Sequence, residues 1–331
     1  MALVDTAYRH WTGRHQGLWW RRWVISENGI RASLANRWMR YLLVVCWVSA
    51  LVEVAALFCV GQLLVADSLI VRLIPNTDAA IQAFVKGLTG WLEQHPEVSV
   101  RTTQNLLFYQ FTTFLLSFNL IVITLTIPRL ITRDLSSHAI VIYASKAVGR
   151  LDYVIGKLGI VVGMLTLTWL GPVVMAWFLG NLLAPDWHFF WHARAALGHA
   201  LLFVGLGMLF LGVLALAVSA VSARSRATIG LWLILWLVGN AFVPFAEHSR
   251  PWLRHLSFRH NLDQAAVAIF QPKEDLQRAQ TQIPILGDIV RRMTRQGPRR
   301  WQTDDAGSAF LALGIMVFAS GLVLSSRIQR E

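Results

Sequence analysis

Charged residues are scarce in this chain of 331 residues, because 15% of them are Asp, Glu, Lys or Arg whereas 55% are hydrophobic. An ordinary soluble domain carries about 25% charged residues, so the composition excludes that class of protein. Cysteine is also scarce. The two cysteines, Cys46 and Cys59, lie in one apolar run, where their separation along a helix would be roughly 20 Å, which excludes a disulfide between them.

The apolar runs are long enough to cross a bilayer as helices, since about 20 residues suffice. The sequence therefore predicts an all-α polytopic membrane protein with a single transmembrane domain over residues 1–331. No repeat of 20 to 50 residues divides the chain. The six predicted spans are 41–65, 106–127, 155–183, 197–221, 228–245 and 307–325.

Residues 1–40 contain seven Arg and five Trp ahead of the first apolar run. Indole rings favour the headgroup level of a membrane and Arg favours anionic lipid, so this arm predicts an amphipathic helix on the membrane surface. The apolar run that follows is too long for a secretory signal peptide. The segment Ser26–Gly29 predicts a break between the surface helix and a helix that enters the first span.

Basic residues are distributed unequally between the two sides of the predicted membrane. The arm 1–40, the loop 128–157, the turn 222–227 and the tail together carry sixteen Lys/Arg and five Asp/Glu. The excess of cations predicts that these segments, and both termini, are cytoplasmic in a multi-pass protein of the cell (inner) membrane. The loop 246–307 is assigned to the outside despite its ten Lys/Arg, because the charge rule weakens for a loop of about 60 residues.

Both outer loops show helical spacing of apolar residues. In the loop 66–105, the spacing over 81–92 predicts a helix on the outer leaflet or a lid over a translocation path. In the loop 246–307, the segments Asn261–Phe270 and Ile283–Met293 predict short interfacial or re-entrant helices, interrupted by prolines. The candidate surface for an extracytoplasmic partner consists of Arg291, Arg292, Arg295, Arg299 and Arg300.

Glycines recur at helical spacing in two of the predicted spans. Small residues allow helix backbones to approach closely inside a membrane, so we expect a packing role for them and no role in substrate binding. These glycines are Gly159 and Gly163 in the third span and Gly198, Gly205 and Gly212 in the fourth.

Glu53 is the only carboxylate in the middle of a predicted span. A charged group there costs roughly 2.5 to 3.5 kcal/mol on insertion scales, which the apolar neighbours offset. Two interpretations remain open: a polar contact in a cavity or gate, with Asn119 and Asn240 as further candidates, or a packing residue paired with a group such as Asn119. A lone carboxylate makes a poor proton relay, so we expect the energy source in another chain.

His188 and His192 are spaced i, i+4 and could present two imidazoles to a metal. No third ligand follows at a convincing spacing, so interfacial packing is favoured and no metal is expected. The segment from Gly149 to Lys157 ends in Gly-Lys but lacks the spacing and the Ser or Thr of a phosphate-binding loop. We therefore expect no catalytic residue and no bound cofactor in this chain.

The loop 128–157 carries an ordered set of polar motifs. Arg133-Asp134 opens it, Tyr143-Ala144-Ser145 lies in its middle, and Arg150-Leu151-Asp152-Tyr153 ends it before Gly156-Lys157 enters the next span. This order resembles the coupling region of membrane permease subunits of ATP-binding cassette (ABC) transporters of the type-2 exporter class. The sequence departs from the family at Ala147, where Pro is frequent, and at Gly149, where Ser is common.

The resemblance implies six spans, an N-terminal elbow helix, a cytoplasmic coupling helix and a second permease copy, identical or not. It also implies a cytoplasmic ABC ATPase subunit that would hold ATP and Mg²⁺. The residues expected to meet that ATPase are Arg133, Asp134, Tyr143, Lys146, Arg150, Asp152 and Tyr153.

The expected function is thus the permease subunit of an ATP-driven exporter, which is not itself an enzyme. The alternative is a non-transporting membrane subunit that transmits ATPase motion to an extracytoplasmic partner. A membrane enzyme is the weakest interpretation, because no acid/base or nucleophile group is apparent, and no nucleic acid partner is expected. For Arg150 itself, an ordinary anchor near lipid phosphate is the alternative.

Overall fold

A computed structural model describes residues 17–63, 96–137, 149–184, 186–244, 251–282 and 306–329. These ranges contain helices and no strand, which confirms the all-α fold class. Four predictions lie outside the described residues: the helix over 81–92, the middle of the coupling segment with Tyr143 and Lys146, the helix Ile283–Met293, and the basic surface from Arg291 to Arg300.

Five helices are long and apolar enough to cross a membrane, and they correspond to five of the six predicted spans. All five begin before the predicted bounds, most of all the second and fourth, which begin at Pro96 and His188, since polar turns continue the apolar helices. The five are α2 (Arg37–Leu63), α5 (Pro96–Thr126), the continuous segment formed by α8 (Arg150–Leu165), η2 (Thr166–Leu170) and α9 (Gly171–Leu182), α10 (His188–Val221) and α17 (Ala306–Gln329).

The remaining predicted span, 228–245, is helical but interrupted. It consists of α11 (Ser225–Leu233), a π-helical turn η3 (Ile234–Val238) and the short α12 (Gly239–Ala241). A π turn adds a residue to the helical repeat and is found mostly as a local bulge. The structure thus supports a membrane protein with at least five apolar helices of spanning length, and the sixth span stays a prediction.

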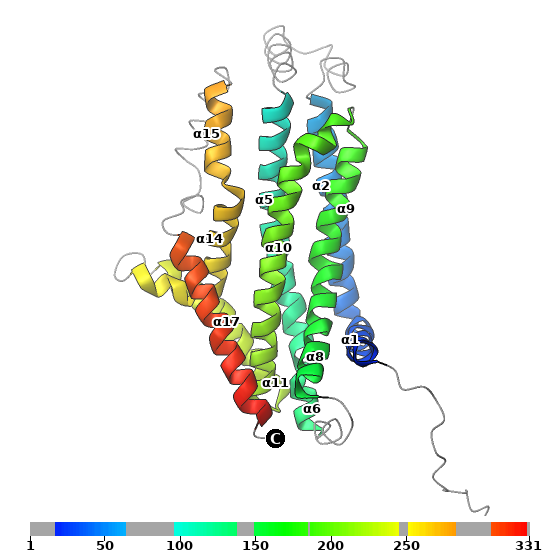
Figure 1. Cartoon of the computed structure of the whole chain (residues 1–331), viewed down its shortest axis with the longest axis vertical. Helices are drawn as coiled ribbons and strands as arrows, with labels where there is room; N and C mark the ends of the chain where they lie inside the picture. Colours follow the sequence, from blue (N-terminus) through cyan, green and yellow to red (C-terminus); the bar gives the residue numbers. More distant parts are fainter. Residues whose placement is uncertain are drawn as a thin grey trace, which may run out of the picture.

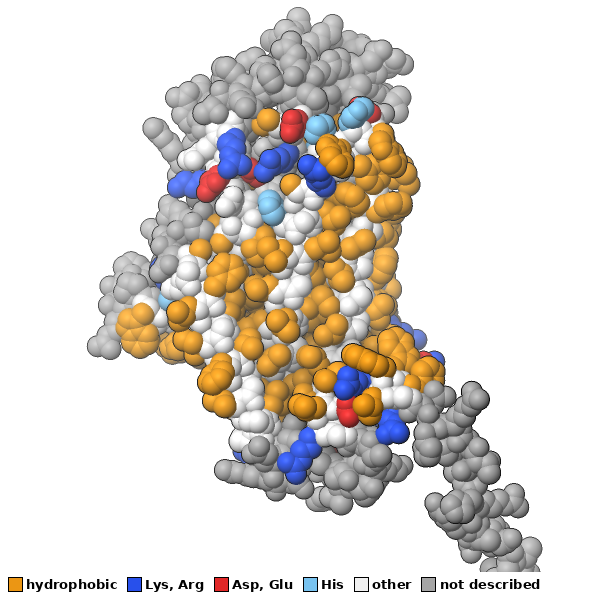
Figure 2. Space-filling view, in the orientation of Figure 1, with side chains coloured by type: hydrophobic (Ala, Val, Ile, Leu, Met, Phe, Trp, Pro, Cys, Tyr) orange, Lys and Arg blue, Asp and Glu red, His pale blue; other side chains and the backbone are white. Residues whose placement is uncertain are grey.

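The long helices form a bundle whose two ends differ (Figure 1). We call one end the α6 end, where α1 (Leu18–Leu34), α6 (Ile131–Ser136) and the turn between α10 and α11 lie. We call the other the α15 end, after α15 (Pro272–Gln282). Figure 2 shows hydrophobic side chains across the middle of the visible face and charged side chains gathered towards its ends, the pattern of a membrane belt.

A proline explains the π turn in the middle of the third span. Pro172 has no N–H to donate to the preceding turn, so carbonyls there need other donors. Trp47 Nε1 donates to the carbonyl of Leu167 at 2.9 Å, and Asn119 Nδ2 lies 3.5 Å from the carbonyl of Thr168. Side chains of α2 and α5 therefore compensate for the irregular backbone of η2.

The segment that precedes α15 packs into the bundle. The 3-10 helix η4 (Pro251–Leu256) leads into α14 (Phe258–Phe270), which confirms the helix predicted over Asn261–Phe270. Ser257 caps α14, and Gln271 ends it in the left-handed conformation, with φ of 48°, just before Pro272 begins α15. One face of α14 is buried against α5, α10 and α17.

The predicted break at Ser26–Gly29 is wrong, because α1 runs through these residues without interruption. The chain turns later, at Ala35 and Asn36, before α2 begins. The small residues serve close packing instead. The hydroxyl of Ser26 donates to the carbonyl of Gly156 in α8 at 2.9 Å, and a side chain at Gly29 would collide with Ile160.

Candidate functional site

The short helix α6 is held against α10 by a network of hydroxyl groups at the α6 end. No side chain of its own segment caps α6. Instead, Ser219 Oγ of α10 accepts the backbone N–H groups of Ile131 and Thr132 at 2.8 and 3.0 Å and donates to the carbonyl of Ile127. Thr132 Oγ1 in turn donates to the carbonyl of Ser219 at 2.8 Å. The start of α6 is therefore fixed in position by the long helix α10.

A buried ion pair joins α6 to α8. Lys157 Nζ lies 2.7 Å from Asp134 Oδ2, with the two side chains 7% and 12% exposed. The hydroxyl of Tyr153 donates to the same carboxylate oxygen at 2.7 Å, and Lys157 also donates to the carbonyl of Leu130 at 2.9 Å. Because the charges are paired and carry further hydrogen bonds, their burial is compensated, and α6 and α8 are linked rigidly.

A second ion pair joins α1 to α8. Arg22 Nη2 lies 2.5 Å from Asp152 Oδ1, and Arg22 Nε donates to the same oxygen at 2.7 Å. At the far end of α1, Arg129 donates to the carbonyls of Ala32 and Ser33, which are last-turn acceptors of the helix. The helix α1 is thus attached at one end to α8 and at the other to the end of α5.

The glycines of α8 allow this close attachment. A side chain at Gly156, Gly159 or Gly163 would collide with Ile25, Ser26 or Ile30 of α1, respectively. A packing role for Gly159 and Gly163 agrees with the prediction from their spacing. In α10 the side-chain position of Gly212 would meet Leu158, whereas those of Gly198 and Gly205 meet no described atom within 4 Å.

The structure divides the predicted ATPase-coupling residues into two sets. Asp134, Asp152 and Tyr153 are engaged within the chain, as described above, and so their side chains stabilise the α6 end. Arg133 on α6 and Arg150 at the start of α8 are exposed. These two guanidinium groups are therefore the described coupling candidates that a partner could reach. No family model matches this chain, and no curated protein matches it.

The cavity or gate candidates do not come together. Glu53 is partly buried on α2, and its Oε1 is enclosed without a hydrogen-bond partner among the described residues. Asn119 is fully buried, accepts from Thr168 Oγ1 at 2.6 Å, and so pairs with Thr168 and not with Glu53. Asn240 is exposed on α12. Asn119 therefore has a packing role and is not the partner of Glu53, while the cavity role and a packing role for Glu53 both stay predictions.

A polar cluster lies at the α15 end. Asn105 Nδ2 of α5 donates to Asp275 Oδ2 of α15 and to the carbonyl of Phe270, both at 2.5 Å. Its Oδ1 lies 2.9 Å from Nδ1 of His199 on α10. The side-chain amide of Asn105 thus links α5 to α10 and α15, and its bond to Phe270 holds the turn between α14 and α15.

Of the two histidines considered for metal binding, His192 is partly buried on α10 and His188 is exposed beside Asp186. His188 Nδ1 lies 2.9 Å from both carboxylate oxygens of Asp186, and its hydrogen bond to this exposed group lowers the pKa of Asp186. Across the described ranges there is no cluster of three or more His, Cys, Asp or Glu that could hold a metal ion. Asp186 and His188 form a local cap at the start of α10.

Several important residues were not predicted from the sequence. Arg22 and Arg129 are two among many basic residues at the ends of spans, and Ser219 is a small hydroxyl inside an apolar run. No spacing rule distinguishes them, since each acts on a helix distant in sequence. The glycine spacing in α8 was the one available signal that α8 receives a closely packed neighbour.

Proposed function

We propose that the chain is the membrane permease subunit of an ATP-driven ABC exporter, coupled to a separate ATPase that holds ATP and Mg²⁺. The α6 end would face the cytoplasm, as its excess of Lys and Arg favours. The proposal draws on the ordered motifs from Arg133 to Lys157, on the apolar helices of spanning length, and on a short helix after the second of them.

The observation that carries the proposal is the rigid connection behind α6. A force on α6 would pass to α8 through the buried pair of Asp134 with Lys157. From α8 it would pass to α1 through Asp152 and Arg22, and Ser219 would pass it from α6 directly to α10. Such a connection converts a push on the exposed side of the six-residue helix α6 into movement of long helices, as a coupling element requires.

The exposed Arg133 and Arg150 would make charge-assisted hydrogen bonds with acidic groups of the ATPase. The carboxylates of Asp134 and Asp152 would not touch the ATPase, since they form ion pairs with Lys157 and Arg22. The proposal therefore separates the residues that contact the partner from the residues that hold the contact surface in place.

The experiment is affinity purification of the full-length tagged chain from its native membranes, followed by mass spectrometry and an ATPase assay. We expect a Walker-motif ATPase to accompany the wild type and to be lost when Arg133→Glu and Arg150→Glu are combined. The matched control is Arg101→Glu, an exposed arginine near the α15 end, which should retain the ATPase. Recovery of a folded wild-type chain without any ATPase contradicts the proposal.

A second candidate function is a non-transporting subunit that passes ATPase motion to an extracytoplasmic partner. The specific observation in its favour is the cluster of Asn105, His199 and Asp275, which connects α15 firmly to the long helices α5 and α10. Motion of these helices would then reach the α15 end. ATPase activity without substrate movement in reconstituted vesicles, together with a bound protein at the α15 end, would favour this candidate over export.

A further inference from the structure

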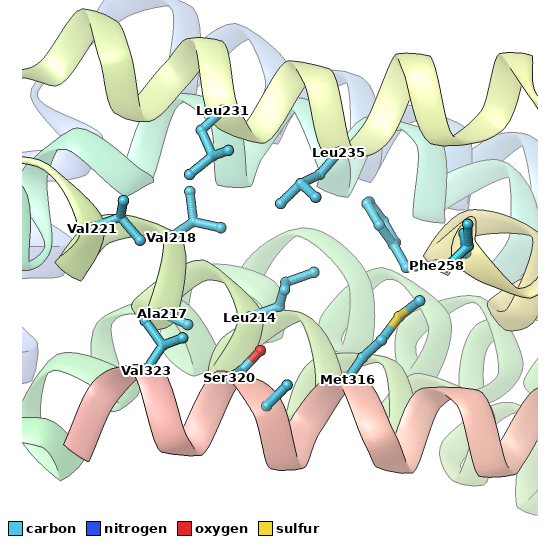
Figure 3. Close-up of a pocket in the computed structure, with 12 residues that line it drawn as sticks. Leu214, Ala217, Val218, Val221, Leu231, Leu235, Phe258, Met316, Ser320 and Val323 are labelled. Carbon is cyan, nitrogen blue, oxygen red and sulfur yellow. The ribbon is translucent and has the colours of Figure 1, made fainter. Parts of the chain in front are cut away.

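An open apolar groove lies on the side of the bundle where α17 meets α10 and α11 (Figure 3). Its volume is about 280 Å³. One wall is formed by Leu214 and Val218 of α10, another by Leu231 of α11, and a third by Met316 of α17, while Phe258 lies at one end. The only hydroxyl in the lining is that of Ser320. Such a surface suits a hydrocarbon chain.

The groove lies within one half of the bundle's length. On α10 its lining runs from Leu214 to Val221, and on α17 from Met316 to Val323. Seven residue steps of helix are roughly 10 Å long, and one leaflet of hydrocarbon is roughly 15 Å thick. Because Val221 is the last residue of α10 at the α6 end, the groove belongs to the leaflet on that side.

Three exposed arginines lie on the elements that form the groove, beyond its lining residues on the side where lipid headgroups would lie. Arg224 lies in the turn between α10 and α11, and Arg226 lies in the first turn of α11. Arg327 lies one helical turn beyond Val323 on α17. Within the described part of the chain, no carboxylate forms an ion pair with any of the three. None of the described residues that line the groove is acidic.

We propose that this groove binds one anionic glycerophospholipid of the leaflet at the α6 end. An acyl chain would occupy the apolar groove, and the phosphate with its anionic headgroup would meet Arg224, Arg226 and Arg327. Basic pockets between membrane helices recognise anionic headgroups in this way, and the length of the groove fits within one leaflet, where it would hold part of an acyl chain. This inference does not depend on the proposed exporter function.

A lipid fits these observations better than a helix from a second copy of the chain. A helix has a diameter of about 10 Å and needs an extended apolar face, whereas this groove is small. Its exposed arginines lie beyond the end at Val221, whereas Arg254 and Arg259 near the other end are partly buried. An acyl chain with an exposed phosphate at one end suits that arrangement. A second copy in the groove is the competing occupant that the experiment must separate.

The test uses the full-length protein, purified and delipidated in detergent, with bound lipid counted by native mass spectrometry. Dioleoyl phosphatidylglycerol and dioleoyl phosphatidylcholine are the two probes, with inorganic phosphate as a competitor. We expect the wild type to retain one phosphatidylglycerol in preference to phosphatidylcholine, and phosphate at millimolar concentration to leave it bound.

Two variants address the two halves of the site. Ala319→Trp fills the groove from an exposed position on α17 and should remove the bound lipid; Ile315→Trp, an exposed residue of α17 outside the groove, should not. The combined change of Arg224, Arg226 and Arg327 to Gln should lower the preference for phosphatidylglycerol by roughly 100-fold.

The matched control removes the same number of charges on the opposite side of the bundle from α17, at Arg31, Arg37 and Arg40. It should preserve the preference for phosphatidylglycerol. Equal binding of both lipids by the wild type overturns the proposal, as does unchanged lipid binding by Ala319→Trp. Displacement by phosphate alone would identify a free anion site, and loss of a dimer in Ala319→Trp without loss of lipid would identify a second copy. Either result overturns the proposal.

Discussion

Arg22 and Asp152 are 130 positions apart in the sequence, yet their side chains form an ion pair that attaches α1 to the first turn of α8. The two side chains are only 20% and 15% exposed, so water screens the pair weakly. Asp152 also lies in the first turn of α8, where a negative charge is favoured by the helix dipole. This pair determines how the amphipathic helix meets the membrane domain.

Removing either partner of this pair should destabilise the α6 end. Arg22→Ala or Asp152→Ala is expected to cost about 1.5 to 3 kcal/mol, the range for hydrogen bonds to charged groups. The charge-swapped chain, Arg22→Asp with Asp152→Arg, should recover part of the loss. Thermal unfolding of the purified protein measures both effects. The control is the exposed pair of Arg31 with Glu27 on the same helix, whose loss should cost less than about 0.5 kcal/mol.

Adding a methyl group to Gly159 should push α1 away from α8. The added Cβ of Gly159→Ala would meet Ser26 Oγ, and this collision outweighs the roughly 1 kcal/mol by which Ala favours a helix over Gly. Gly205→Ala is the matched control, because its Cβ meets no described atom within 4 Å. We expect the melting temperature to fall in the first variant and to stay or rise in the second. Equal shifts in both would contradict the close packing of α1 on α8.

The buried pair of Asp134 and Lys157 should tolerate joint replacement better than single replacement. Asp134→Asn or Lys157→Met alone leaves one buried charge without its charged partner, which costs about 3 to 5 kcal/mol. Asp134→Asn combined with Lys157→Met should cost less than the sum of the two single changes. A double-mutant cycle on thermal stability gives the coupling energy. Additive effects would mean that the two groups do not interact.

As a control for that cycle, Arg278 and Glu274 form an ion pair on α15 with both side chains 56% exposed. Solvent screens this pair, so its removal should change stability by less than about 0.5 kcal/mol.

The cap formed by Asp186 and His188 should respond to acid. The hydrogen bond from His188 lowers the pKa of Asp186, so the contact stabilises the start of α10 above the ordinary pKa of Asp. It is lost as the pH falls through the lowered value, below roughly pH 4. In carboxyl-carbon NMR, His188→Ala should raise the titration midpoint of Asp186. An unchanged midpoint would show that His188 does not stabilise the carboxylate.

The apolar runs alone predicted helices close to the observed ones, because about 20 apolar residues can satisfy their backbone in a membrane only by forming a helix. The glycine spacing in α8 predicted close packing for the same local reason. The break at Ser26–Gly29 was predicted wrongly, since polar and small residues that end an isolated helix can also pack against a neighbour.

The sequence by itself determined the helices, the apolar belt and the distribution of charge, since each depends on residues near one another in the chain. Only the tertiary structure decided that Asp134 and Asp152 point into the chain while Arg133 and Arg150 remain exposed. It also decided that Ser219 positions α6 and that residues of α10, α11 and α17 line one apolar groove. These relationships join helices distant in sequence, and the energies that select them arise only when the helices pack.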